Sequence, residues 1–275
     1  MQKEGRDMKG VVLCADDFAV NASASLGIAR LAAMGRISAT SVMVLSPRWA
    51  QDVTLLQDVR GRIDVGLHLD WTSEFAIAAG HGLSLGAAML KAALGGFDAA
   101  TARVVIERQL DAFEAQWKAP PDYVDGHQHV QQFAGIREAL VQTLRSRYGA
   151  LGPRQPYLRI SRGPVGAAGL KSRVIAAMGS NALENIASKQ GISRATALLG
   201  IYDFAGGPAR YAALMARWLH AAPPGCIIMC HPAQAAEPPD AIGVARLQEF
   251  AYLSGAEFPI ALSEAGVRLV RGPAR

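Results

Sequence analysis

The sequence predicts an α/β fold, a distorted, TIM-barrel-like (β/α) barrel in which parallel strands alternate with helices. Short apolar and β-branched runs recur along the whole chain, and segments with the spacing of amphipathic helices separate them. Eight such runs are found, which is the strand number of a closed barrel, and an open doubly wound sheet is the alternative. No repeat, low-complexity tract or linker divides the 275 residues, so we expect one domain over residues 1–275.

Each expected strand is a run of apolar or β-branched residues bounded by polar residues, Gly or Pro. In chain order the runs are residues 11–15, 40–45, 63–69, 123–126, 157–160, 197–202, 226–230 and 267–270. Helices are expected between them, over residues 22–34, 48–59, 102–117, 136–148, 170–189, 209–219 and 244–254. Asn21 is the expected N-cap of the first helix. In the third, Leu110, Phe113 and Trp117 lie on one apolar stripe.

The composition is globular, with no signal for export or membrane insertion. Apolar residues make up 51% of the chain and charged residues 19%. The longest uncharged stretch, residues 75–90, is interrupted by Gly, His and Ser, so we expect no membrane span; its Gly content suggests a cover over the site. The polar N-terminus has no apolar signal core, and Cys14, Cys226 and Cys230 are too few for a disulfide framework. A cytoplasmic protein is therefore expected.

The net charge of +5 is unevenly distributed. Between Ala139 and Leu183 there are seven basic residues and no acidic one. This stretch suits an anionic substrate, or it is a solvated face of an Arg-rich protein. Aromatic residues do not interleave with the charges in the way that single-strand binders require, so no nucleic-acid partner is expected.

Polar residues follow most of the expected strands. In folds of parallel strands, active sites form at the carboxyl ends of the strands. The residues expected at this rim are Asp16, Asp17, His68, Asp125, His127, His129, Arg159, Asp203 and His231. So many polar side chains at one end of the sheet predict the functional site.

The run Asp125-Gly126-His127-Gln128-His129 indicates a metal. If the strand continues, side chains two residues apart share one face, so the carboxylate and both imidazoles converge on one cavity. His68 and the paired aspartates add to this set. Imidazole with carboxylate suits zinc, manganese, nickel, cobalt or iron, and magnesium suits a site of carboxylate and water.

The adjacent residues Asp16 and Asp17 can have two different roles in the site. Adjacent residues of an extended chain point to opposite sides, so both face the site only where the strand has ended in a turn. One aspartate can then bind the metal while the other takes a proton from the water that the metal activates. His231 leaves a very apolar strand and enters a loop, a position that suits a general acid for a leaving group.

Five short motifs resemble those of the YdjC-like carbohydrate deacetylase family and occur in that family's order. They are Leu13-Cys14-Ala15-Asp16-Asp17-Phe18, Thr40-Ser41-Val42-Met43-Val44, Val65-Gly66-Leu67-His68-Leu69, Asp125-Gly126-His127-Gln128-His129-Val130 and Met229-Cys230-His231-Pro232. They run from residue 13 to 232 and so cover most of the chain. The resemblance implies a distorted (β/α) barrel, often a homodimer, that hydrolyses acetamido groups on sugars with one divalent metal ion.

Carried over residue by residue, the resemblance implies that Asp17, His68 and His127 bind the metal. It implies Asp16 as the general base and His231 as the general acid. The expected ion is magnesium or zinc, with manganese, cobalt and nickel as alternatives.

Three further residues belong to the predicted site. His129 also matches the family motif and either binds metal or lines the substrate cleft; we place it, with Arg159, on the substrate. Asp125 is expected to support the ligands without binding the ion. The substrate is expected to be a small N-acetylated saccharide or glycoconjugate, which the basic stretch would suit if it is anionic.

The chain departs from the family pattern near these motifs. Ala19, Gln131 and Ala233 stand where the resemblance leads us to expect Gly, His and Gly. None of them is a proposed ligand. Because neighbouring loops would touch the sugar, the glycan specificity stays open.

Three other functions use part of the same residue set. Two His and one carboxylate also hold Fe(II) in oxygenases. A catalytically inactive glycan- or glycolipid-binding protein would keep the pocket, but it has little use for the proton-transfer pair of Asp16 and His231. A hydrolase of phosphoester or glycosidic bonds is disfavoured, because no Gly-rich phosphate cradle is evident and the paired carboxylates are adjacent rather than placed to flank a glycosidic bond.

Overall fold

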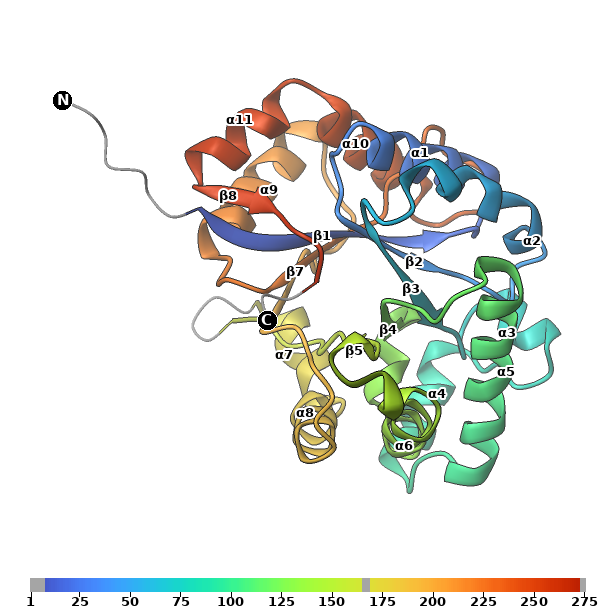
Figure 1. The fold of residues 1–275 in the computed structure, drawn as a ribbon. Coiled ribbons are helices and arrows are strands. Elements are labelled where there is room, and N and C mark those ends of the chain that lie inside the picture. The colour runs from blue at the N-terminus through green and yellow to red at the C-terminus, as the bar shows by residue number, and fades with distance from the viewer. Residues whose placement is uncertain (1–7, 165–168, 273–275) are drawn as a thin grey trace.

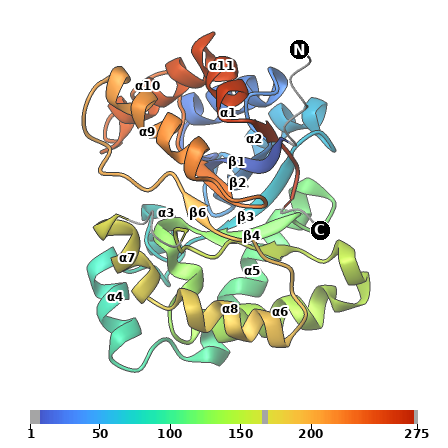
Figure 2. The same cartoon turned by 90° about the vertical axis from the view of Figure 1, so that its left-hand side faces the viewer.

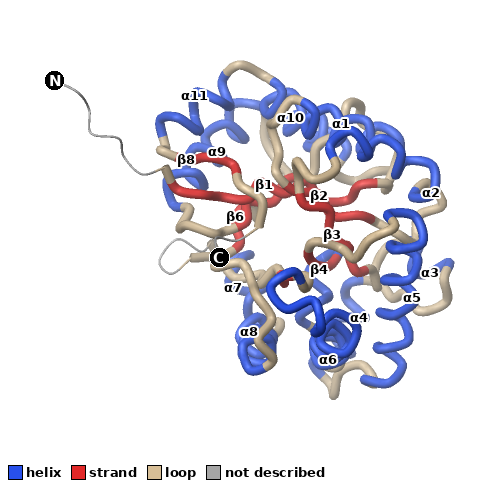
Figure 3. The backbone as a smooth tube through the Cα atoms, viewed as in Figure 1, coloured by secondary structure: helices blue, strands red, loops and turns tan. Residues whose placement is uncertain are grey.

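The computed structural model describes residues 8–164 and 169–272 and confirms the distorted (β/α) barrel. Seven parallel strands form one curved sheet in the order β5-β4-β3-β2-β1-β7-β6, and β8 pairs with the start of β1. Strands gather in the centre with helices around them (Figures 1 and 3). The strands are β1 (Lys9–Phe18), β2 (Ala39–Val42), β3 (Asp64–Leu69), β4 (Tyr123–Gly126), β5 (Tyr157–Leu158), β6 (Leu198–Leu199), β7 (Ile227–Cys230) and β8 (Val267–Leu269).

Helices cover both sides of the sheet. They are α1 (Ala22–Ala33), α2 (Trp49–Asp52), α3 (Glu74–Ala78), α4 (Leu85–Ala93), α5 (Ala99–Trp117), α6 (Ile136–Tyr148), α7 (Leu170–Ala177), α8 (Ser180–Lys189), α9 (Pro208–Ala221), α10 (Gly243–Ser254) and α11 (Glu257–Glu264), with the 3₁₀ helices η1 (Val53–Val59), η2 (His127–Gln132) and η3 (Gly149–Arg154). Helices α1, α9, α10 and α11 lie on one side, and α4, α5, α6 and α8 on the other (Figures 1 and 2).

Local sequence explains the helices that were expected. Asn21 caps α1, because its Oδ1 accepts the Ala24 N–H at 2.8 Å. In α5 the apolar stripe of Leu110, Phe113 and Trp117 is buried, as its spacing predicts. The cap thus fixes where α1 begins, and the buried stripe fixes which face of α5 packs inward.

The barrel is closed only loosely between its edge strands. The Leu158 N–H of β5 donates to the Ser193 carbonyl at 2.9 Å, and the Ala195 N–H donates to the Leu158 carbonyl at 3.0 Å. The segment before β6 therefore joins β5 to β6. Because β5 and β6 have only two residues each, the result is a distorted half-barrel rather than a regular one.

The helices depart from the sequence expectations in several places: residues 48–59 form α2 and the 3₁₀ helix η1 instead of one helix, and α11 was not predicted. Residues 170–189 form two helices, because Gly179 adopts φ +127° and a Cβ there would lie 2.2 Å from the Gln132 carbonyl oxygen. The stretch expected only to cover the site contains two helices that the sequence analysis did not predict, α3 and α4, of which α4 ends at Ala93. The signals missed were Ser73 and Ser84, whose hydroxyls accept N–H groups of the first turn of each helix.

The three cysteines are buried and unpaired, as the cysteine count predicts. In the described part of the chain, no helix has the length and apolar character needed to cross a membrane.

Candidate active site

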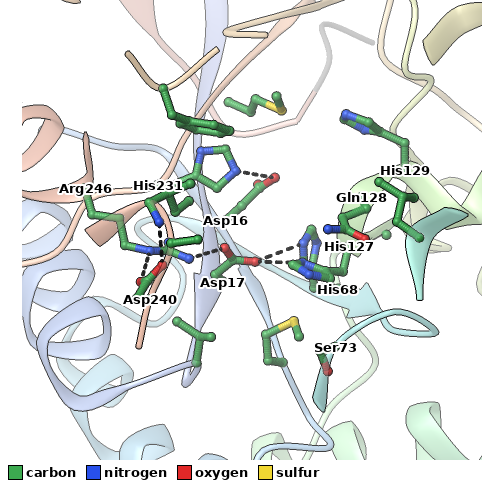
Figure 4. Close-up of a pocket in the computed structure, with 18 of the residues that line it drawn as sticks. Asp16, Asp17, His68, Ser73, His127, Gln128, His129, His231, Asp240 and Arg246 are labelled. Carbon is green, nitrogen blue, oxygen red and sulfur yellow. Dashed lines mark hydrogen bonds and ion pairs between the residues drawn. The ribbon is translucent and has the colours of Figure 1, made fainter. Parts of the chain in front are cut away.

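A cavity of about 730 Å³ opens at the carboxyl ends of the strands. Asp16 and Asp17 reach it from β1, His68 from β3, His127 from the segment after β4, and His231 from the segment after β7. The volume lies in the range of small-molecule sites. Seven of the nine residues expected at the rim line this one cavity (Figure 4), whereas Asp125 is buried beneath it and Asp203 is exposed and pairs with Arg210 at 2.6 Å instead.

Asp17 is the centre of the polar cluster. Its Oδ1 lies 3.3 Å from His68 Nε2 and 3.2 Å from His127 Nδ1. We expected the strand to end before Asp17, but β1 continues to Phe18. Instead β1 is irregular between Ala15 and Phe18, and Asp17 adopts φ +67°, a left-handed conformation that Asp tolerates. This irregularity lets both aspartates face the cavity.

The segment after β4 differs from the expected continuation of the strand. It turns at once into η2, and Gln128 and His129 both have positive φ, +52° and +65°. Asp125, His127 and His129 therefore do not share one face. Asp125 stays in the strand beneath the cavity, His127 approaches Asp17, and His129 contacts Ser161.

One atom from each of Asp17, His68 and His127 lies within 4.8 Å of the others, and this set fits a divalent metal. Two ligands at about 2.1 Å from one ion are about 3.0–3.4 Å apart at octahedral or tetrahedral angles, close to the separations of Asp17 Oδ1 from the two imidazoles. His68 Nδ1 lies 2.6 Å from Asp125 Oδ1, which orients the ring with Nε2 toward Asp17. Asp125 thus contacts a candidate ligand and does not belong to the set of three itself.

Asp16 lies deeper, among partners that hold it ionised. Arg159 Nη1 donates to its two carboxylate oxygens at 2.7 and 2.8 Å, and the Ser41 hydroxyl donates at 3.0 Å. Burial opposes the charge of Asp16, but the Arg159 guanidinium and the nearby imidazoles outweigh it. The pKa of Asp16 therefore lies well below its usual range.

Arg159 is fully buried, and the same Nη1 atom also lies 2.8 Å from Asp125 Oδ2. The structure thus places this predicted substrate-binding residue against two carboxylates at the base of the cavity.

His231 stands beside Asp16. Its Nε2 lies 4.0 Å from Asp16 Oδ2, and the Phe204 ring packs edge-on against it with 5.2 Å between ring centroids. Burial, with only partial compensation by Asp17 and Asp16, lowers the pKa of His231 to about 4. His231 is therefore neutral in the resting site at neutral pH.

His129 lines the cavity without joining the metal cluster. Its Nδ1 lies 2.9 Å from the Ser161 hydroxyl. Burial and the Arg159 charge lower the pKa of His129 to about 3. This geometry is compatible with the second of the two expected roles, contact with substrate.

Sequence reasoning missed two residues of α10. Arg246 Nη2 donates to Asp17 Oδ2 at 2.7 Å, and its Nε donates to Asp240 at 2.6 Å. Glu249 accepts the Tyr202 hydroxyl at 2.6 Å and the backbone N–H of His231. Both charged residues are buried, and their spacing of three residues places them on one helix face. Charged residues on the inward face of an otherwise apolar helix were the available signal.

The walls of the cavity are largely apolar away from the cluster. Phe75, Leu85 and Met89 from α3 and α4 line one part, so residues 74–90 do contribute to the site. Val174 and Met178, from α7 and just after it, line another.

Three of the seven basic residues of the basic stretch, Arg147, Arg159 and Arg162, pair with acidic residues from elsewhere in the described part of the chain. Arg147 pairs with Asp111 and Glu114 at 2.7 Å each, and Arg162 pairs with Glu184 at 2.6 Å. Of its seven basic residues, Arg159 and Lys171 line the cavity.

A family model described as YdjC-like protein matches residues 10–264. A crystal structure from Enterococcus faecalis V583, described as a candidate cellobiose-phosphate cleavage protein, is similar with 18% identity and a TM-score of 0.71, over 96% of this chain and 97% of that one. The Xyl-CE4 domain of a multidomain xylanase from the hindgut metagenome of Trinervitermes trinervoides is similar with 10% identity and a TM-score of 0.51, over 96% and 87%. None of the curated proteins matches the chain.

Proposed function

The chain belongs to the YdjC-like protein family, and we propose that it is a metal-dependent carbohydrate deacetylase that removes acetyl groups from N-acetylated sugars. The observation that carries the proposal is the convergence of Asp17, His68 and His127 at a cavity that also holds Asp16 and His231. A metal-dependent hydrolase needs a metal site and a proton-transfer pair side by side, and a binding protein has no use for the proton-transfer pair.

Asp17, His68 and His127 would hold one divalent ion. When bound, the ion would polarise the acetamido carbonyl and activate water. Asp125 keeps His68 Nε2 directed at the ion site, and Arg246 keeps Asp17 Oδ1 directed there by binding Oδ2.

Asp16 and His231 would carry the proton. Asp16 is ionised and takes a proton as water attacks the carbonyl carbon. Because its pKa is low, Asp16 would give this proton up readily, and neutral His231, whose Nε2 lies 4.0 Å from Asp16 Oδ2, would receive it through one bridging water or after a small approach of the two side chains. His231 then protonates the nitrogen as the C–N bond breaks, and the products are acetate and an amino sugar.

Three other residues are proposed to contact the sugar or to order the site. His129 would bind a substrate oxygen from the cavity wall. Arg159, predicted to bind substrate, would act mainly by fixing Asp16. Lys171 would meet a negatively charged substituent, and salt-insensitive binding of such a sugar would count against that part of the proposal.

The first test combines metal content with acetate release. We expect about one divalent ion per chain, and acetate release from N-acetylglucosamine or its short oligomers after loading with zinc, manganese or magnesium. Absence of bound metal after soaking would remove the central inference. Iron-dependent oxygen consumption without acetate release would favour an oxygenase.

The proton role is tested by Asp16→Asn, which should keep the ion but lose about 10²–10⁴-fold in kcat, since Asn cannot accept the proton. Ser41→Ala removes one hydrogen bond to Asp16 and serves as the matched control, with a much smaller expected loss. A near-normal rate in Asp16→Asn would exclude Asp16 as the base.

A further inference from the structure

The wall of the cavity that carries His129 contains a chain of hydrogen bonds with a fixed direction. Gln131, Ser161 and His129 form it, and the first two are fully buried. Gln131 is also one of the three positions where the sequence departs from the family pattern. Figure 4 shows His129 on the side of His127 and Gln128, away from Arg246 and Asp240.

A backbone carbonyl group sets the direction of this chain of hydrogen bonds. The Gln131 amide nitrogen lies 3.1 Å from the Arg159 carbonyl oxygen. A carbonyl oxygen can only accept, so the NH₂ end of the amide must face it. The second hydrogen of that NH₂ group is directed at the Ser161 Oγ, 3.0 Å away. Ser161 therefore accepts from Gln131.

Ser161 must place its own hydroxyl hydrogen elsewhere. In the described part of the chain, the acceptor within reach is His129 Nδ1, at 2.9 Å. A buried hydroxyl that donates nothing costs about 1–3 kcal/mol, so Ser161 donates and Nδ1 accepts. A neutral imidazole that accepts at Nδ1 carries its proton on Nε2.

We infer that His129 is a hydrogen-bond donor of fixed tautomer, whose Nε2–H binds an uncharged acceptor oxygen of the substrate, such as a sugar hydroxyl. His129 lines the cavity, and its Nε2 has no partner among residues 8–164 and 169–272. The choice of a sugar as ligand rests on the proposed function. His129 is thus a substrate-positioning and specificity residue, held in place by Gln131 and Ser161.

The tautomer of His129 can be tested without measuring enzymatic activity. The ¹⁵N chemical shifts of the His129 ring, assigned by their loss in His129→Asn, should show the proton on Nε2 in the wild type at pH 7. Ser161→Ala should shift part of the population to the Nδ1–H form. A proton on Nδ1 in the wild type would overturn the inference.

The donor role is tested by a matched pair of substitutions. In His129→Gln the amide nitrogen can occupy the place of Nε2, whereas in His129→Asn the shorter side chain reaches only the place of Nδ1. With N-acetylglucosamine oligomers we expect His129→Gln to stay within about twofold of the wild-type KM, and His129→Asn to raise KM about fivefold to tenfold with kcat retained, the loss of one neutral hydrogen bond.

The backbone does not confound this pair, because Asn tolerates the positive φ of residue 129 better than Gln does. Equal KM values for the two variants, or a loss in kcat alone, would overturn the donor role. Absence of acetate release by the wild type would instead refute the proposed function, and the ring shifts would still decide the tautomer.

Discussion

Two clusters of metal-ligand side chains lie side by side at the carboxyl ends of the strands, and they differ in how their charge is balanced. The upper cluster is Asp17, His68 and His127; the lower cluster is Cys14, Asp16 and Asp125. In each, the ligand atoms lie within 4.8 Å of one another. Residue types and spacing alone do not distinguish them.

The lower cluster already contains its cation. Arg159 Nη1 lies within 2.8 Å of both carboxylates, and burial raises the pKa of the Cys14 thiol well above its usual value, so the thiol is protonated. All three residues are completely or almost completely buried.

In the upper cluster, Arg246 binds only one oxygen of Asp17, and His127 is partly exposed to the cavity. A group of ligand side chains is therefore a candidate metal site only under two conditions. No Arg or Lys side chain may already neutralise the whole group, and the group must be open enough for an ion to enter.

The largest expected effect comes from removing the cation of the lower cluster. Arg159→Met should lower the free energy of unfolding by about 3–5 kcal/mol, because it leaves two buried carboxylates uncompensated. Urea unfolding measures this. Arg103→Gln, which breaks the exposed pair with Glu107, should change stability by less than about 0.5 kcal/mol. Equal effects of the two variants would contradict the assignment of Arg159 as the cluster's cation.

Metal binding should separate the two clusters. His68→Ala should weaken divalent metal binding by at least about 100-fold, whereas Cys14→Ala should leave it within a few-fold of the wild type. Calorimetric titration with zinc or manganese on chelator-treated protein measures both. Loss of the ion in Cys14→Ala with retention in His68→Ala would reverse the comparison.

The guanidinium of the upper cluster should have a smaller effect on the ion. Arg246→Gln should weaken metal binding by about 10–100-fold, because Asp17 loses the donor that orients its carboxylate. Asp240→Asn, which weakens the ion pair of Arg246 but removes no hydrogen bond to Asp17, should weaken metal binding less. Tighter binding in Arg246→Gln would instead mean that charge repulsion by Arg246 dominates.

Glu249 extends the comparison to a buried carboxyl group with no guanidinium hydrogen-bonded to it among the described residues. Burial raises its pKa from 4.5 to about 7. Between these values the folded protein binds more protons than the unfolded chain, so the contribution of Glu249 to stability is present below about pH 4.5 and is lost as pH rises through about 7.

The measurement is the unfolding free energy at pH 5 and pH 8. From pH 5 to pH 8, the unfolding free energy of the wild type should fall by roughly 1–3 kcal/mol relative to that of Glu249→Gln. A pH-independent difference would mean that Glu249 is ionised throughout.

Much of the fold could be predicted from the sequence, because strand and helix periodicity are local properties. The eight strands all occur, and Asn21 and the stripe on α5 act as their residue types require. The break at Gly179 could not be predicted in this way, because it depends on the approach of the Gln132 carbonyl from a distant segment.

For the site, the sequence determined which residue types stand at the ends of the strands, and these include all three residues of the upper cluster. The sequence could not show which of the aspartates are already paired with a positively charged side chain. That depends on Arg159 and Arg246, which reach the aspartates from 143 and 229 residues further along the chain.

The tertiary structure also decided the direction of each side chain. The left-handed conformations of Asp17, Gln128 and His129 redirect neighbouring residues to different partners. Such conformations are held by contacts between distant segments rather than by local preference. The sequence thus determines the residue types and the order of the elements. The charge balance and the geometry of the site are decided only by the tertiary structure, which brings the ends of the strands together at one rim.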